Sequence, residues 1–463
     1  MGEDSVSIRD RVGSFVAETR WETLPREVRE QARRCLVDTL GATLAGTLTR
    51  VSEITSGFAV ETWPGHEATI LLRGQRCGAV GAAFANGWAA NSLDIDDGLR
   101  YAYGHGGAQI FATALAVAEA RGLDGKRMLA GMVVGYEVAH RVGRCWHDSR
   151  EVYQACGSWG SVASAATAAN LLDLNSQQVW EALGIAEYHA PNAPMMRDVD
   201  NPAMVKHATG WGTMTGVTSA QLAARGFTGI PSMLGFETYK DSVKEIGDDY
   251  LMVGGVAWKQ KGYACCSWAH AAARGARELL DEHGIAPEAI DRIVVEGFHE
   301  TVRLGTELPT TTEEAQFNVA WPVAAMVLDG EIGPAQTLEE RLSDPELRAL
   351  ARKVSLVESE ELNELVRLYE KGDPRGRFAS RVAIHLADGR VVRSGLVDEG
   401  SKFPNPVWER ERMEEKFRWV VGSVLDEAGV ARVLEVAWQV DALGDVGELV
   451  EVCEGGGGSP QQS

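Results

Sequence analysis

Apolar residues recur at helical spacing along most of the N-terminal half of the chain. In residues 24–46 the apolar face consists of Val28, Ala32, Leu36 and Leu40. Side chains four positions apart lie on the same face of an α-helix, so this stretch predicts an amphipathic helix. The same criterion predicts two helices in 5–49 and others at 79–90, 108–120, 126–143, 161–172, 176–189, 214–225 and 271–284.

Beyond residue 290 the pattern changes to short, β-branched apolar runs, which predict strands. These runs lie at 292–298, 353–356, 381–387 and 391–396, with predicted helices between them at 318–329 and 359–370. Strands mixed with helices after an all-helical stretch indicate a separate α+β domain. We expect this domain at 269–402, between an all-helical region at 1–268 and a helical return at 403–454. The Gly/Ser/Gln-rich tail, 455–463, should be disordered.

The composition argues against several classes of function. A net charge of −21 without a basic block disfavours nucleic acids and anionic membrane surfaces as partners. No apolar run is long enough to span a membrane, and the charged N-terminal residues lack the apolar core of a signal peptide. Seven cysteines without a CxxC pair argue against a disulfide framework or a zinc ribbon. We expect a soluble, cytoplasmic protein.

Residues 91–107 carry the densest cluster of reactive side chains. Asp94, Asp96 and Asp97 are followed by His105 and two glycines, directly before a predicted helix. The first turn of a helix has N–H groups without intrahelical partners and the positive end of the helix dipole, so an anionic ligand beside His105 would be stabilised. The two glycines would let such a ligand approach the backbone.

Three interpretations of this stretch stay open from its residues alone. It could be a solvated loop whose histidine caps a helix. Clustered carboxylates also bind Mg²⁺, as in the aspartate-rich motif of terpenoid cyclases, but Arg100 stands three positions after Asp97 where that motif needs an acid. The third interpretation is proton transfer on a small carboxylate, with an aspartate orienting His105.

Basic side chains gather in two further stretches. The loop at 189–212 holds His189, Arg197, Lys206 and His207, and the stretch at 259–270 holds Lys261, Tyr263 and His270. A pocket for an acidic substrate must be locally basic in so acidic a chain, which makes these residues candidates for binding carboxylates. The alternatives are a solvated surface loop and, for the cysteines at 265 and 266, small buried apolar side chains.

Seven segments of the chain resemble the MmgE/PrpD family, which contains 2-methylcitrate dehydratase, cis-aconitate decarboxylase and an iminodisuccinate epimerase. They occur in the family's order over nearly the whole chain. The segments are LPREVREQARRCLVDTLGATLAG, NGWAANSLDIDD followed by HGG, GYEVAHRVGR, GSWGSVASAATAANLLDL, MVKHATGWG with ARGFTG, KGYACCSWAH, and AQFNVAWPVAAMVLDGEIG.

The resemblance implies a mainly α fold, in which a large all-helical domain built from both chain ends carries an inserted, smaller α+β lid domain. It also implies a homodimer, with a site in the cleft between the domains that needs no cofactor and no metal ion. By motif, the family's active-site residues correspond here to Asp94, His105, Lys206, Lys261 and His270.

The chain departs from the family pattern at four positions. Gly98 stands where decarboxylase-like members have threonine, and Gln154 where many members have histidine. Trp321 replaces a tyrosine, and Cys266 a further histidine of the decarboxylase. Two proton-transfer groups and two hydroxyl groups are therefore missing, which argues against cis-aconitate decarboxylation in particular.

The function that the resemblance favours is elimination of water from a small hydroxy di- or tricarboxylic acid. The reaction removes a proton beside a carboxylate and passes through an enediolate, which fixed positive charge stabilises. We expect Lys206 and Lys261 to supply that charge and to bind carboxylates, with Arg197 as a further candidate.

In this elimination of water, we expect histidines to transfer the protons. We expect His105, oriented by Asp94, to act as general acid or base, and His270 to be the complementary group. The other side chains expected to contact the substrate are Tyr263, Gln154, Trp321 and Cys266. Decarboxylation, isomerisation or epimerisation of a related acid, and a non-catalytic relative, are the alternatives.

Overall fold

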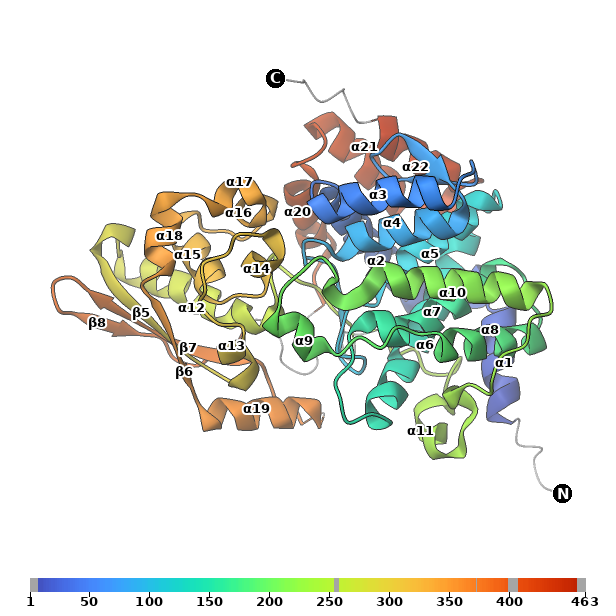
Figure 1. The fold of residues 1–463 in the computed structure, drawn as a ribbon, viewed down its shortest axis with the longest axis horizontal. Helices are drawn as coiled ribbons and strands as arrows, with labels where there is room; N and C mark the ends of the chain where they lie inside the picture. Colours follow the sequence, from blue (N-terminus) through green and yellow to red (C-terminus); the bar gives the residue numbers. More distant parts are fainter. Residues whose placement is uncertain (1–6, 254–257, 372, 399–406, 456–463) are drawn as a thin grey trace.

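The structure is a computed structural model that describes residues 7–253, 258–371, 373–398 and 407–455. The N-terminal part is helical (Figure 1). Its helices are α1 (Ile8–Glu18), α2 (Arg26–Gly46), α3 (Arg50–Thr62), α4 (Ala79–Asn91), α5 (Gly107–Ala120), α6 (Gly125–Asp148), α7 (Cys156–Leu171), α8 (Ser176–Tyr188), α9 (Met195–Asp200), α10 (Thr209–Ala224) and α11 (Lys240–Val243). Two strand pairs lie among them, β1 (Ala68–Ile70) with β2 (Gln75–Cys77) and β3 (Gly98–Leu99) with β4 (Trp258–Lys259).

Small residues let the central helices pack closely. Helices α4, α5 and α7 are buried on almost every side, α10 is buried on one face, and all four carry small residues at many positions. A Cβ atom at Gly160 in α7 would lie less than 3.0 Å from Gln109 in α5, and one at Gly216 in α10 would lie as close to Ser164 in α7. The segment around 160 therefore serves helix packing.

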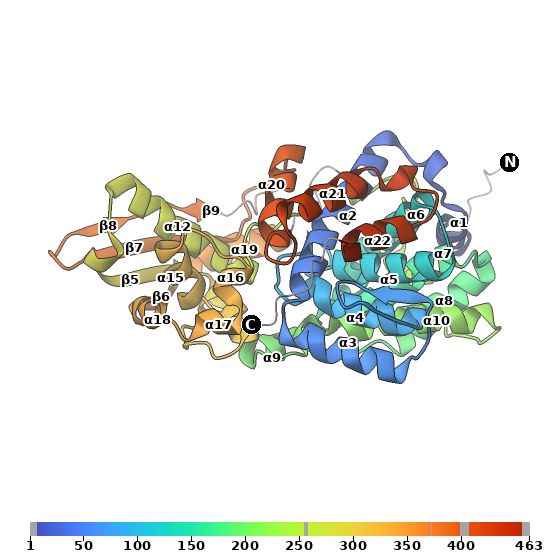
Figure 2. The same ribbon diagram turned by 90° about the horizontal axis from the view of Figure 1, so that it is seen from above.

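The C-terminal helices return to the helical part (Figure 2). They are α20 (Arg410–Val421), α21 (Glu427–Trp438) and α22 (Gly447–Gly455). Lys416 in α20 forms a buried ion pair of 2.6 Å with Asp38 in α2, and Arg33 pairs with Asp441 at 2.7 Å. One hydrophobic core therefore contains residues from both ends of the chain. Residue 455, expected to begin a disordered tail, is the last residue of α22, and 456–463 lie outside the described residues.

The remaining described elements form an α/β part around a five-stranded sheet with the order β6-β5-β7-β8, in which β9 also pairs with β7. The strands are β5 (Ile290–Gly297), β6 (Val354–Glu358), β7 (Ala379–Leu386), β8 (Val391–Arg393) and β9 (Val397–Asp398), with β5 and β6 parallel. The helices are α12 (Ser267–His283), α13 (His299–Arg303), α14 (Thr312–Gln316), α15 (Ala320–Leu328), α16 (Pro334–Thr337), α17 (Glu339–Leu342), α18 (Pro345–Ala351) and α19 (Glu360–Glu370).

A second hydrophobic core lies between this sheet and α12 and α15 (Figure 1). Alternate residues such as Ile293 and Val295 of β5 and Val382 and Ile384 of β7 point into it, as strand geometry requires. The mainly α class expected from the sequence is confirmed. No helix among the described residues is both long enough and apolar enough to span a membrane.

Several boundaries differ from the sequence-based expectation. The stretch 189–212, expected to be a loop, contains α9, the 3-10 turn η2 (Lys206–Ala208) and the start of α10. Helix α12 begins at Ser267, four residues before the expected start. Helix α3 was not expected, because the side chains that it buries are mostly small or hydroxyl-bearing, such as Thr55, Ser56 and Ala59.

Candidate active site

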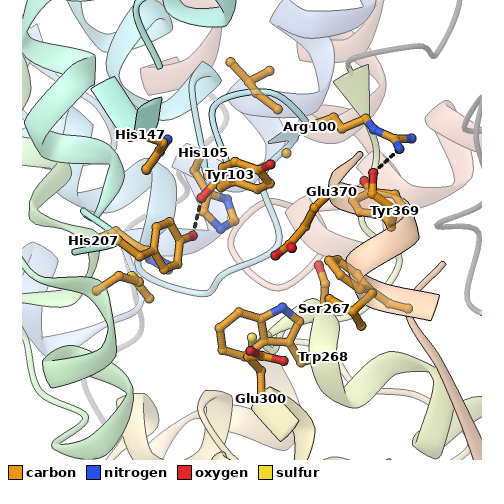
Figure 3. A pocket seen from close by; sticks show the side chains of 18 of the residues that line it. Arg100, Tyr103, His105, His147, His207, Ser267, Trp268, Glu300, Tyr369 and Glu370 are labelled. Atoms are coloured by element: carbon orange, nitrogen blue, oxygen red, sulfur yellow. Dashed lines mark hydrogen bonds between the residues drawn. The ribbon is translucent and has the colours of Figure 1, made fainter. Parts of the chain in front are cut away.

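A cavity of about 430 Å³ lies between the helical part and the α/β part (Figure 3). Its inner end is lined by residues from the segments next to α4, α5, η2 and α12. These inner residues are Asp94, Gly98, Leu99, His105, His207, Lys261 and Cys266.

Asp94 lies at the centre of the inner end. Its backbone has φ 53°, in the left-handed region that aspartate tolerates better than most residues. The carboxylate contacts Lys261 directly, and it lies 3.2 Å from His105 Nε2 and 3.7 Å from Lys206 Nζ. Burial alone would raise the pKa of Asp94, but these three cationic groups outweigh it and hold the pKa well below its ordinary value. Asp94 is therefore ionised.

His105, directly before α5, lies between two carboxylates. Its Nε2 atom is 3.2 Å from Asp94 Oδ1, and its Nδ1 atom is 3.2 Å from Asp96 Oδ1. Burial would lower the pKa of His105, but the two aspartates outweigh burial and raise the pKa to about 9. At neutral pH His105 is therefore an imidazolium, which can donate a proton.

The start of α5 is not an open anion site, contrary to the expectation from the sequence. Asp97 occupies it, because its Oδ1 atom accepts a hydrogen bond of 3.0 Å from Gly107 N, while Oδ2 accepts bonds of 2.6 Å from Tyr136 and Trp258. A Cβ atom at Gly107 would lie less than 3.0 Å from Tyr136, so this glycine makes room for the protein's own side chains. Asp97 thus has a structural role.

His207 is the neighbour of His105 on the cavity wall, with the two ring centroids 4.7 Å apart. Its Nδ1 atom lies 2.9 Å from Asn91 Oδ1, and Asn91 Nδ2 donates a hydrogen bond of 2.8 Å to Asp96. Because Asp96 orients the amide, its oxygen faces His207, which assigns the proton to Nδ1 and leaves a lone pair on Nε2.

The protonation state of His207 is opposite to that of His105. Burial, reinforced by the positive charge of His105, holds the pKa of His207 well below its ordinary value. His207 is therefore neutral and can accept a proton. Sequence reasoning named His207 only as one of several basic residues in a loop, since its contact with the aspartate-rich stretch depends on the tertiary fold.

The two lysines differ in their access to the cavity. Lys261 lines the cavity beside Asp94, and that ion pair outweighs burial and raises its pKa. Lys206 is buried behind Asp94, where its Nζ atom donates hydrogen bonds to Gln316 and, at 3.2 Å, to Asn91 O. Burial lowers the pKa of Lys206.

Most of the other expected site residues do not line this cavity. Arg197 is exposed on α9. Trp321 lies in the second hydrophobic core and donates a hydrogen bond of 2.9 Å to Gln336 O. The side-chain oxygen of Gln154 accepts a bond of 2.9 Å from Ala193 N, which ties the segment before α7 to the segment before α9.

His270 and Tyr263 lie together behind the cavity wall, with ring centroids 4.9 Å apart. His270 is fully buried, and its Nε2 atom lies 3.0 Å from Cys265 O. Cys266 does line the cavity, and burial together with Asp94 raises the pKa of its thiol to about 12. The histidine next to His105 on the cavity wall is therefore His207 and not His270, which was expected there.

The donor atoms of Asp94, Asp96 and His105 lie within 4.8 Å of one another, a spacing that suits a metal ion. Asp94, however, already faces Lys261, Lys206 and the protonated His105. A divalent cation would have to displace these positive groups, so the charge balance suits proton transfer better than metal binding.

Two family models match most of the chain. The MmgE/PrpD N-terminal domain matches residues 10–238, and the MmgE/PrpD C-terminal domain matches residues 263–441. Cis-aconitate decarboxylase of Aspergillus terreus is 25% identical over 472 residues, which cover 93% of this chain and 92% of the relative. Cis-aconitate decarboxylase of Homo sapiens is 27% identical over 458 residues, which cover 93% of this chain and 91% of the relative. This chain belongs to the MmgE/PrpD family.

Proposed function

We propose that this protein is a cofactor-independent lyase that eliminates water from a small hydroxy di- or tricarboxylic acid. The observation that carries the proposal is the pair of adjacent histidines in opposite protonation states, His105 charged and His207 neutral. Elimination of water requires one group that accepts a proton and one that donates a proton, and this pair supplies both.

In the proposed reaction the Nε2 atom of His207 removes the proton from the carbon beside a substrate carboxylate. The electron pair of that C–H bond forms the new double bond as the C–O bond breaks, and His105 donates its proton to the departing hydroxyl group. Negative charge grows on the substrate carboxylate during this step. Lys261, with Lys206 behind Asp94, stabilises that charge, and both lysines are buried.

Decarboxylation is the second candidate, and the names of the relatives favour it. Loss of carbon dioxide leaves a carbanion that needs only a proton donor, which His105 provides. The missing hydroxyl and imidazole groups at Gly98 and Cys266 argue for water elimination, since these positions face the cavity. We further propose that the α/β part acts as a lid over the cavity.

The test is mass spectrometry of the products from a panel of hydroxy and unsaturated di- and tricarboxylic acids, with a metal chelator present. A product lighter by one water supports the proposal, while a product lighter by carbon dioxide establishes the second candidate. Chelator-sensitive activity would contradict the metal-free mechanism. A folded protein that converts no acid of the panel would overturn both and favour a non-catalytic relative.

A further inference from the structure

The outer half of the cavity is not used by the proposed chemistry. Its walls come from α9, α12, α13, α19, Lys259, the segments 100–104 and 147–153 and the segment before β7, and they combine apolar and aromatic side chains with charged ones. The apolar and aromatic residues include Met195, Met196, Trp268, Val366, Tyr369 and Phe378. In Figure 3 Trp268 and Tyr369 lie across the cavity from His105 and His207.

The size of the cavity exceeds what the reacting carbons need. Pockets of about 300–1,000 Å³ hold drug-sized ligands, and this cavity of about 430 Å³ lies within that range. A bare tricarboxylic acid held by Lys261 and the two histidines would leave the aromatic end unfilled.

Charged side chains line both ends of the cavity. The outer end carries Glu300 and Glu370, and burial followed by the charge of Glu300 raises the pKa of Glu370. A third acid, Glu151, lines the cavity as well, together with the cations Arg100, Arg150 and Lys259. Each cation lies on an aromatic face: the guanidinium carbon of Arg100 is 3.9 Å from the ring centroid of Tyr369, that of Arg150 is 3.7 Å from Trp146, and Lys259 Nζ is 5.4 Å from Phe378. The three cations and three acids of the outer end balance, so that end does not attract an anionic group, whereas His105, Lys206 and Lys261 outnumber Asp94 and Asp96 at the inner end.

We propose that the outer end is a subsite for an uncharged, apolar arm of the substrate, so that the acid consumed carries a substituent of several carbons. The two methionines suit such an arm, since the flexible thioether side chain adapts to ligands of different shape. This inference rests on the proposed function, because it takes the inner end as the place of the carboxylates.

The experiment measures binding of a series of 2-alkylsuccinates by calorimetry, from 2-methylsuccinate to 2-hexylsuccinate, none of which carries a hydroxyl group to eliminate. We expect each added methylene to tighten binding by about two- to fourfold until the outer end is filled. Affinity that stays flat or weakens along the series would overturn the subsite. Tighter binding of an arm that ends in an amine would also overturn it, in favour of a cationic arm facing the glutamates.

Two variants test whether the apolar arm of the ligand binds at the outer end of the cavity. Met196→Trp fills part of the outer end, so it should abolish the gain in affinity from the longer arms, and Trp268→Ala should reduce that gain by removing one wall. Asn201→Trp, on the exposed end of α9, is the matched control and should keep the full gain. If longer arms still bind more tightly to both cavity variants, the arm does not bind at the outer end and the proposed subsite is wrong.

These binding measurements distinguish failure of the proposed carboxylate site at the inner end from failure of the proposed apolar subsite at the outer end. If 2-methylsuccinate binds to wild type and binds more weakly to Lys261→Met, the carboxylate site at the inner end is supported. The change of affinity with chain length then tests the apolar subsite alone. If no succinate of the series binds to folded wild-type protein, the carboxylate site itself fails, and the subsite with it.

Discussion

His105 and His207 lie in contact, yet different neighbours hold them in opposite protonation states. Asp94 and Asp96 flank His105, whereas His207 meets the neutral amide of Asn91. Asp96 influences both rings, because it lies beside His105 and accepts a hydrogen bond from Asn91, whose side-chain oxygen faces His207. A single carboxylate therefore links the proton donor to the proton acceptor.

Removing either histidine should lower turnover by about 10²–10⁴, the usual contribution of one acid or base. His105→Gln and His207→Asn are suitable changes, since asparagine tolerates the left-handed backbone of residue 207, where φ is 54°. His283→Gln, at the exposed end of α12, is the control and should keep full activity. Steady-state kinetics with the identified substrate is the measurement, and near-normal turnover in either active-site variant would refute its assigned role.

Asp94→Asn should destabilise the protein and lower the pKa of His105, because it removes the carboxylate that balances a buried lysine and a buried imidazolium. Loss of one partner from a buried ion pair costs about 3–5 kcal/mol, measurable as the free energy of unfolding in urea. Asp241→Asn, which breaks an exposed pair with Lys244, should have little effect. Equal stability of the two variants would show that Asp94 is not needed for charge balance.

The same charges set a pH dependence of stability. The pKa of His105 rises from 6.5 to about 9 on folding, so its ion pairs stabilise the protein fully below about pH 6.5. This contribution is lost as pH rises through about 9. In Asp94→Asn the loss should be smaller, since one of the two aspartates no longer carries charge.

At the scale of elements, η2 positions the acceptor histidine through an unusual backbone. His207 and Ala208 both have left-handed φ, of 54° and 55°, and α7 packs directly against them. A Cβ atom at Gly157, in the first turn of α7, would lie less than 3.0 Å from Ala208 O. The glycine at this helix start is therefore required by η2 rather than by a ligand.

Gly157→Ala should consequently displace η2, destabilise the protein by about 1–3 kcal/mol as overpacking does, and reduce turnover. Gly57→Ala in α3 is the matched control, because nothing lies within 4 Å of its Cβ position, and replacing a helical glycine by alanine typically stabilises by roughly 0.5–1 kcal/mol. Thermal unfolding and kinetics of the two variants provide the comparison. A Gly157→Ala protein as active as Gly57→Ala would contradict the positioning role of α7.

Periodicity predicted most helices and the sheet strands, because the N-terminal half of α2 and the strands β5 and β7 each bury one regular face. It failed for α3 and η2, which are held by tertiary contacts rather than by a regular apolar pattern. The site was predictable where its residues are close in sequence, as with Asp94 and His105. His207 and Asn91 meet across more than a hundred residues of chain, and nothing in their local sequences indicates that contact.

At the scale of the whole molecule, the helical part exposes an aromatic surface on α3 and α10, which lie on either side of α4 (Figure 1). Ile54 and Phe58 of α3 and Trp211 of α10 are 44–46% exposed. The buried ring of Phe84 joins them, with its centroid 5.9 Å from Phe58 and 5.5 Å from Trp211. Contiguous exposed apolar side chains mark interaction sites, and the resemblance to the family leads us to expect a homodimer.

Trp211→Glu should then shift the protein from dimer to monomer in sedimentation experiments, because it buries a charge in the contact. Val357→Glu, an equally exposed apolar position on β6, should leave the dimer intact. A wild-type protein that sediments as a monomer at micromolar concentration, or a Trp211→Glu dimer, would remove this surface from consideration.

NMR of isotope-labelled histidine nitrogens tests the opposite protonation of His105 and His207 without any substrate. Spectra of wild type, with His105→Gln and His207→Asn for assignment, report charge and tautomer directly. We predict an imidazolium for His105 at neutral pH that loses its proton near pH 9, and a neutral, Nδ1-protonated ring for His207. Two neutral rings at neutral pH, or two rings that titrate together near the ordinary histidine pKa, would contradict the mechanism.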